Sequence, residues 1–127
     1  MATDITVTGK KKLKTIKKEF NEKFPYIRLG IYPTSEKDKP KKAQFDPEKT
    51  IVEVRTKSNP GEISIHGRTK VKTLENEFDK IFGLYVQVAF TTKEEKRYFT
   101  SGDLDELSLT AINALGEKEG WKKGDWE

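Results

Sequence analysis

Most side chains that carry enzymatic chemistry are scarce in this chain, which has one histidine, His66, and no cysteine. A thiolate nucleophile, a disulfide and a thiolate metal site are therefore excluded, and a zinc site usually needs several cysteine or histidine ligands. A Ser-His-Asp triad would have to use His66, but no G-x-S-x-G surrounds any serine, and no P-loop or dinucleotide fingerprint is present. The spacing of the acidic residues indicates no catalytic pair. We expect a non-enzymatic protein without catalytic residues, metal or cofactor.

Tyrosine and arginine side chains alternate with apolar ones in several short segments. If Ile27, Leu29 and Ile31 face a core, the residues between them face away, and the same phase applies to the segments at 50–56, 62–66 and 84–90. The outward set consists of Tyr26, Arg28, Tyr32, Arg55, His66, Tyr85 and Gln87. Because tyrosine and arginine are enriched at binding hot spots, the set predicts an exposed sheet face that binds a protein partner. The alternative is a face that another element covers, or one that cross-strand pairs merely stabilise.

Positive charge is concentrated at the N-terminal end of the chain. Residues 1–43 contain 12 basic and 5 acidic side chains, a net charge of +7, whereas the remainder has a net charge of −3. Seven of these lysines lie opposite the apolar stripe of the first predicted helix or in the loop at 33–49: Lys10, Lys11, Lys14, Lys18, Lys39, Lys41 and Lys42. Such a patch could contact phosphates, so nucleic acid is the alternative partner. A merely solvated helix face is the competing interpretation.

Two junctions place a glycine and a basic residue just before a predicted helix, at Thr8-Gly9-Lys10 and His66-Gly67-Arg68. Free backbone amides and the helix dipole at such a junction can hold an anion. Alternatively, each glycine only permits a tight turn. Both interpretations are open at the level of sequence.

An internal repeat determines where these residues lie. Residues 4–24 and 62–82 are identical at eight of 21 positions with an offset of 58, and the similarity extends through a one-residue slip to 4–32 and 62–90. Each copy predicts a strand, a break at glycine, an amphipathic helix and a second strand. We interpret the repeat as a duplicated unit with approximate two-fold symmetry.

Further elements follow each copy of the repeat. The β-branched, alternating segment 50–56 predicts a strand that a turn at Asn59-Pro60-Gly61 joins to the next strand as a hairpin. A strand at 96–101 and a helix that begins after Ser108 and ends at Gly116 or Gly120 complete the chain. The expected fold is therefore α+β, a two-layer sandwich of two β-α-β-β units with helices on one face of a mixed or antiparallel sheet, plus a C-terminal helix.

Composition is typical of one folded domain spanning residues 1–127. Only 33% of residues are hydrophobic and 36% are charged, but 13 aromatic residues and a net charge of +4 argue against disorder. No apolar run approaches the roughly 18 residues of a membrane span, and the N-terminus lacks a signal-like apolar stretch. We expect a soluble cytoplasmic monomer or weak dimer with a flexible loop at 33–49 and a mobile tail at 120–127. Its expected function is that of a small binding or accessory module.

Overall fold

The computed structural model describes residues 4–36, 44–57, 63–100 and 102–124. The helices and strands follow in the order β1 (Ile5–Val7), α1 (Leu13–Lys23), β2 (Arg28–Tyr32), α2 (Ile51–Val54), β3 (Ile63–Ile65), α3 (Val71–Phe82), β4 (Tyr85–Thr91), β5 (Arg97–Phe99) and α4 (Leu109–Glu119). Two 3-10 turns, η1 (Thr34–Glu36) and η2 (Gly102–Glu106), precede α2 and α4 respectively. The predicted α+β class and antiparallel pairing are confirmed. None of the described helices is long and apolar enough to cross a membrane.

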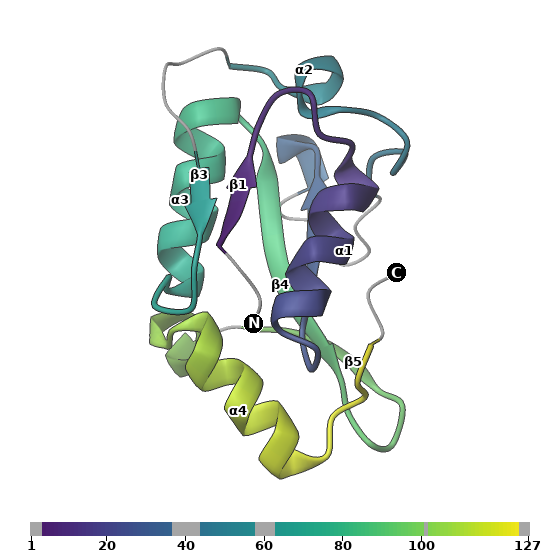
Figure 1. Cartoon of the computed structure of the whole chain (residues 1–127), viewed down its shortest axis with the longest axis vertical. Coiled ribbons are helices and arrows are strands. Elements are labelled where there is room, and N and C mark those ends of the chain that lie inside the picture. Colours follow the sequence, from purple (N-terminus) through teal and green to yellow (C-terminus); the bar gives the residue numbers. More distant parts are fainter. Residues whose placement is uncertain (1–3, 37–43, 58–62, 101, 125–127) are drawn as a thin grey trace.

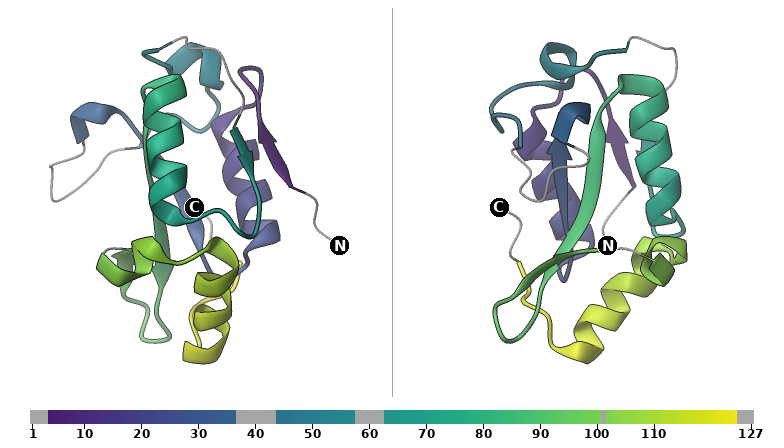
Figure 2. Two further views of the ribbon diagram at one scale, coloured as in Figure 1. Left: turned by 90° about the vertical axis from the view of Figure 1, so that its left-hand side faces the viewer. Right: turned by 180° about the vertical axis from the view of Figure 1, so that it is seen from behind.

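The strands form two antiparallel sheets, whereas the sequence predicted one. β1 pairs with β3, and β2, β4 and β5 form a three-stranded sheet in the order β2-β4-β5. Figure 1 shows β1 and β3 between α1 and α3, with β2 and β4 behind them. The single-sheet expectation is wrong because the strands lie on two sides of the helices α1 and α3. The pair β1 and β3 covers one side of the core, and the three-stranded sheet covers the opposite side (Figure 2).

The core is built from the predicted apolar stripes of the two long helices. On α1 the stripe consists of Leu13, Ile16 and Phe20, and on α3 it consists of Val71, Leu74, Phe78 and Phe82; all are buried. Full burial of one such side chain stabilises the fold by about 1.5–3 kcal/mol. α1 ends before Pro25, which cannot continue a helix, and α3 ends at Gly83. Both helix predictions are confirmed.

The strand predicted at 50–56 is wrong, because residues 51–54 form the short helix α2. The Thr50 hydroxyl accepts a hydrogen bond from Glu53 N, and the Glu53 carboxylate accepts one from Thr50 N at 3.0 Å. This capping box satisfies the first helical turn and outweighs the β-propensity of the segment. Only the second half therefore contains the β-α-β-β order. The predicted Asn59-Pro60-Gly61 turn lies outside the described residues.

The C-terminal helix agrees with its prediction at both ends. The Ser108 hydroxyl accepts a hydrogen bond from Ala111 N at 3.1 Å, and Gly120 caps the end of α4 with φ of 78°. Three residues of the predicted tail contact the body of the protein: Trp121 stacks on Phe90 with ring centroids 3.9 Å apart, Lys122 N donates to Thr91 O, and Gly124 N donates to Pro25 O. Of the predicted loop, Phe45 N donates to Ile31 O at 3.3 Å beside β2. The predicted mobility stays a prediction, and residues 37–43 and 125–127 lie outside the described residues.

Backbone hydrogen bonds recur in the two halves with donor and acceptor each displaced by 58 residues, the offset of the sequence repeat. The bond from Leu13 N to Lys49 O recurs as the bond from Val71 N to Leu107 O. In the same way, Ile51 N to Lys11 O recurs as Leu109 N to Thr69 O, and Val52 N to Gly9 O recurs as Thr110 N to Gly67 O. The central pairs of the two strand registers, Thr6 with Ser64 and Gly30 with Gln87, also join equivalent positions. A pseudo-twofold axis therefore passes through both strand pairs. Duplication is our interpretation of this symmetry.

Candidate functional site

The outer face of the three-stranded sheet carries four of the seven residues that the sequence assigned to a binding face. Arg28 and Tyr32 alternate on β2 with the buried Leu29 and Ile31, and Tyr85 and Gln87 occupy the matching phase of β4. Figure 2, in its right-hand view, shows that none of the described helices crosses this face of β2 and β4. The structure therefore brings Arg28, Tyr32, Tyr85 and Gln87 together.

The other three predicted residues lie elsewhere, so the expectation of one shared face is wrong for them. Tyr26 precedes β2, and its N–H donates to Asn113 Oδ1 on α4 at 2.9 Å. Arg55 ends α2 rather than lying on a strand. His66 follows β3 in the two-stranded sheet, and the buried His66 Nδ1 has no hydrogen-bond partner in the part of the chain that the structure describes.

β5 adds two residues to the outer face that the sequence analysis missed. In the β4–β5 register, Arg97 lies opposite Thr91 and Phe99 lies opposite Ala89. The Arg28 guanidinium donates to Thr91 Oγ1 at 2.7 Å, which ties β2 to β4 across the face. The sequence predicts a strand at 96–101 but not which of its side chains lie on the outer face. Pairing it with 89–91 across the turn at 92–95 would have placed Arg97 and Phe99 correctly.

An aromatic cluster centred on Tyr32 covers the middle of this face. The Tyr32 ring centroid lies 5.9 Å from that of Tyr85 and 6.1 Å from that of Phe99. Tyr32 is only 5% exposed, although its strand position points outward. Its ring lies across Gly30, where an added Cβ would come within 2.7 Å of Tyr32 Cε2. The glycine therefore allows the ring to lie flat along β2.

Beside this cluster is a pocket of about 250 Å³. Its lining consists of Arg28, Leu29, Gly30, Tyr32, Gln44, Ala89, Arg97, Tyr98 and Phe99. Aromatic rings and two guanidinium groups are part of this lining. This combination offers apolar contact together with directional donors for an anionic group.

The Tyr32 hydroxyl is a neutral donor at physiological pH. Burial raises the pKa of the Tyr32 hydroxyl above its usual value, and the Arg28 guanidinium acts in the opposite direction with a smaller effect. The folded state therefore holds the phenolic proton more tightly than the unfolded state. The resulting stabilisation is fully present below the unfolded pKa and is lost as the pH rises through the folded one.

We accordingly expect the free energy of unfolding to fall as the pH rises past the ordinary tyrosine pKa of about 10. Tyr32→Phe removes the titrating group and should flatten this part of the profile. Urea unfolding at a series of alkaline pH values measures both profiles. An equal alkaline slope in the wild type and in Tyr32→Phe would contradict the assignment to Tyr32.

The predicted basic patch is partly neutralised by carboxylates. Lys11 pairs with Glu19 at 2.7 Å, and Lys14 pairs with Glu48 at the same distance. Glu48 also pairs with Lys12 at 3.1 Å. Hydrogen bonds from Lys14 and Lys12 hold the pKa of the Glu48 carboxyl below its usual value. A groove of about 940 Å³ along α1 accordingly mixes both charges on its lining, which consists of Lys14, Thr15, Lys17, Lys18, Glu19, Glu22, Pro47 and Glu48.

Two further lysines of that patch, Lys10 and Lys18, have no ion pair with any residue that the structure describes. Lys39, Lys41 and Lys42 lie outside the described residues. Within the described ranges the lysines of α1 therefore form no uniformly basic surface, since Glu19 and Glu48 interrupt it. The nucleic-acid alternative for this patch stays a prediction.

The glycine junctions serve close packing. At the start of α1, Leu13 N and Lys14 N already donate to backbone carbonyls at 2.8 and 2.9 Å, which removes the amides that an anion would need. A Cβ on Gly9 would lie 2.6 Å from Val52 Cγ2, and one on Gly67 would meet Thr110 Oγ1. The glycines therefore admit the first turns of α2 and α4, and the anion-site interpretation is wrong for the first junction.

Comparison with protein-family models, curated proteins and solved structures finds no match for the chain. Among the residues that the structure describes, no group of three or more histidine, aspartate or glutamate side chains could hold a metal ion. The functional conclusion therefore rests on the outer sheet face, which combines aromatic side chains, two arginines and a pocket.

Proposed function

We propose that the protein is a small binding module whose protein partner docks on the outer face of the three-stranded sheet. The observation that carries the proposal is the pocket beside the aromatic cluster, whose lining includes Tyr32, Phe99 and the two arginines Arg28 and Arg97. Binding energy in protein interfaces concentrates in a few aromatic and arginine side chains around well-packed pockets. This face offers that combination on a rigid sheet, which positions side chains more firmly than a loop.

Exposed aromatic side chains on β5 support the same proposal. Tyr98 is 49% exposed and Phe99 is 39% exposed, and the other large hydrophobic side chains exposed in the described ranges, Val52 and Leu107, lie away from β5. An apolar edge strand favours unwanted pairing, which proteins usually suppress with charge. Tyr98 packs on Phe90 with ring centroids 5.7 Å apart, on the face of β5 opposite to Phe99. Phe99 lies at the edge of the outer face and adds little to the core, so partner binding is the better explanation for its exposure.

Phe99→Ala tests the proposal by removing one wall of the pocket. The purified variant and the wild type are immobilised, exposed to nuclease-treated native lysate, and compared for retained proteins. We expect a protein that the wild type retains and Phe99→Ala loses, because truncation of a hot-spot residue costs about 2 kcal/mol or more of binding free energy.

Leu107→Ala is the matched control, since Leu107 is 37% exposed but lies between η2 and α4 rather than on the sheet. It should retain the partner as the wild type does. Equal retention by all three proteins would contradict the proposal. If the wild type retains proteins from untreated lysate but not from nuclease-treated lysate, the result would instead favour the nucleic-acid alternative.

A further inference from the structure

We infer that residues 121–124, here called the C-terminal strap, hold the hairpin of β4 and β5 in the position that the partner needs. The inference rests on the proposed function and names how that binding face is regulated. The strap docks on the side of the hairpin that faces the helices, whereas the partner docks on the outer face. Docking on one side therefore strengthens docking on the other.

β5 is the least supported strand of the three-stranded sheet. Its three residues, Arg97–Phe99, are all exposed, and among the described strands it pairs with β4 only. A segment with few buried contacts opens at a lower free energy than the core does. The position of β5 therefore depends on what packs against the inner side of the hairpin.

The strap supplies this support through an aromatic stack. Trp121 lies flat on Phe90, with ring centroids 3.9 Å apart and ring planes 11° apart, and Tyr98 packs on Phe90 at 5.7 Å. Phe90 and Tyr98 lie opposite each other in the strand register, and Phe90 packs against the core. Ala89 and Phe99, one position along, belong to the outer face. The stack therefore supports the hairpin from the side that the partner does not contact.

Backbone hydrogen bonds attach the strap to the sheet and to the chain after α1. Lys122 N donates to Thr91 O at the end of β4, and Gly124 N donates to Pro25 O, both at 2.8 Å. The Lys122 ammonium also pairs with Glu95 in the turn of the hairpin at 3.5 Å. Figure 1 shows the chain leaving α4 and running back beside β5. The strap therefore connects the hairpin to the body of the protein.

The end of α4 fixes where the tryptophan ring lies. Trp121 N donates to Gly116 O at 2.9 Å, after Gly120 has turned the chain with φ of 78°. A Cβ on Gly116 would lie 2.6 Å from Trp121 Cε3 and 2.7 Å from Tyr26 Cβ, so the glycine leaves the space that the ring occupies. The ring is almost fully buried there. It therefore fills a defined slot between α4 and β4.

These contacts couple the two sides of the hairpin. With the strap docked, β5 stays against β4, and the rings of Phe99 and Tyr32 keep their centroid distance of 6.1 Å on the outer face. With the strap released, β5 loses its inner packing, and the partner must order the hairpin at the expense of binding free energy. The affinity for the partner therefore follows the fraction of molecules in which the strap is docked.

Amide hydrogen exchange of the full chain tests the inference without the partner. The reporters are the N–H groups of Thr92 and Thr100, which donate hydrogen bonds across the hairpin, and the reference is Leu13 N–H at the start of α1. We expect Trp121→Ala to speed exchange at the reporters by at least about tenfold relative to the reference. Trp121→Phe retains a ring and should recover most of the wild-type protection.

Phe82→Ala is the matched control, since Phe82 is a buried aromatic residue at the end of α3, which Figure 1 shows far from the hairpin. It should speed exchange at the reporters no more than at the reference. If Trp121→Ala does not fold, Gly116→Ala displaces the ring without removing it, at a helical position that alanine favours. It should give the same selective effect at the reporters.

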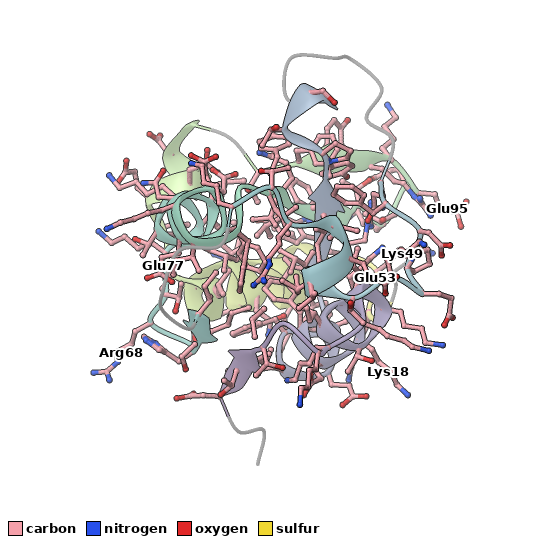
Figure 3. All side chains as sticks on the ribbon, turned by 90° about the horizontal axis from the view of Figure 1, so that it is seen from above. Lys18, Lys49, Glu53, Arg68, Glu77 and Glu95 are labelled. Carbon is pink, nitrogen blue, oxygen red and sulfur yellow. The ribbon has the colours of Figure 1, made fainter. Side chains whose placement is uncertain are left out.

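Glu95→Gln tests the ion pair of the strap separately. Because the pair with Lys122 is exposed, its loss should speed exchange at the reporters by less than about threefold. Glu77→Gln is its control, since Figure 3 shows Glu77 and Glu95 on opposite sides of the molecule. A larger effect of Glu95→Gln than of Trp121→Ala would overturn the role of the aromatic stack.

The lysate experiment separates the strap from the proposed function. Trp121→Ala should lose the protein that the wild type retains, although Trp121 lies on the inner side of the hairpin, and Trp121→Phe should retain it. The inference is overturned if the reporters exchange no faster in Trp121→Ala than in Phe82→Ala, or if Trp121→Ala retains the partner as the wild type does. A wild type that retains no protein would reject the proposed function, and exchange at the reporters would still decide whether the strap holds the hairpin.

Discussion

Phe78→Ala is expected to lower the free energy of unfolding by about 3–5 kcal/mol, the usual cost of truncating a buried phenylalanine. The Phe78 side chain is fully buried in the core, and its ring contacts that of Phe82 at a centroid distance of 5.9 Å in an edge-to-face arrangement. Truncation removes the apolar contact and leaves a cavity that the surrounding helix and sheet cannot fill completely. Urea unfolding followed by circular dichroism measures the change.

Phe99→Ala provides a control with the same atoms removed. Because Phe99 is 39% exposed on an edge strand, its truncation should cost about 1 kcal/mol, well below the core value. Phe20 occupies the pseudo-symmetric position on α1 and is equally buried, so Phe20→Ala should resemble Phe78→Ala. Equal costs for Phe78→Ala and Phe99→Ala would contradict the position of the core.

The three longer helices, α1, α3 and α4, could be predicted from the sequence because each of them carries its own periodic apolar stripe. Leu13, Ile16 and Phe20 recur at helical spacing whatever the rest of the chain does, and Pro25 marks the end of the helix. The segment at 50–56 was ambiguous, because Val52 and Val54 alternate like a strand. The Thr50 and Glu53 capping box is visible in the sequence and outweighs β-propensity over so short a run.

The candidate site could be predicted only where it depends on a single strand. Arg28 and Tyr32 follow from alternation along β2 alone. The pocket, in contrast, depends on Gly30, because Tyr32 lies across that glycine, and on the register that brings Phe99 opposite Ala89. The β4–β5 register follows from the short turn at 92–95, but the packing of the Tyr32 ring over Gly30 is a tertiary property that no local pattern in the sequence encodes.

Neutralisation of the basic helix could not be predicted for the same reason. Glu48 is 34 residues from Lys14 in the chain, and its position depends on hydrogen bonds that Leu13 N and Lys14 N donate to the backbone at 47–49. Net charge along the sequence therefore overstates how basic this surface is.

Gly83→Ala is expected to lower the free energy of unfolding by about 2–4 kcal/mol, which combines a backbone and a packing cost. Gly83 ends α3 with φ of 65°, a left-handed conformation that costs an L-residue about 1–2 kcal/mol. An added Cβ would also meet Thr56 Oγ1 and would come within 3.2 Å of Lys57 N. The segment at 56–57 is held in place by hydrogen bonds, since Thr56 N donates to Phe82 O at 2.9 Å and Thr56 Oγ1 donates to Gly83 O at 2.8 Å.

Gly120→Ala separates the two costs, because Gly120 ends α4 with a similar φ of 78° in open surroundings. The nearest atom to a Cβ there is Lys93 Cδ at 3.7 Å, an ordinary contact. Urea unfolding of both variants should therefore show that Gly120→Ala pays only the left-handed cost of about 1–2 kcal/mol, with the remainder for Gly83→Ala reporting the clash with Thr56 and Lys57. Equal destabilisation by the two substitutions would contradict the packing of residues 56–57 against the end of α3.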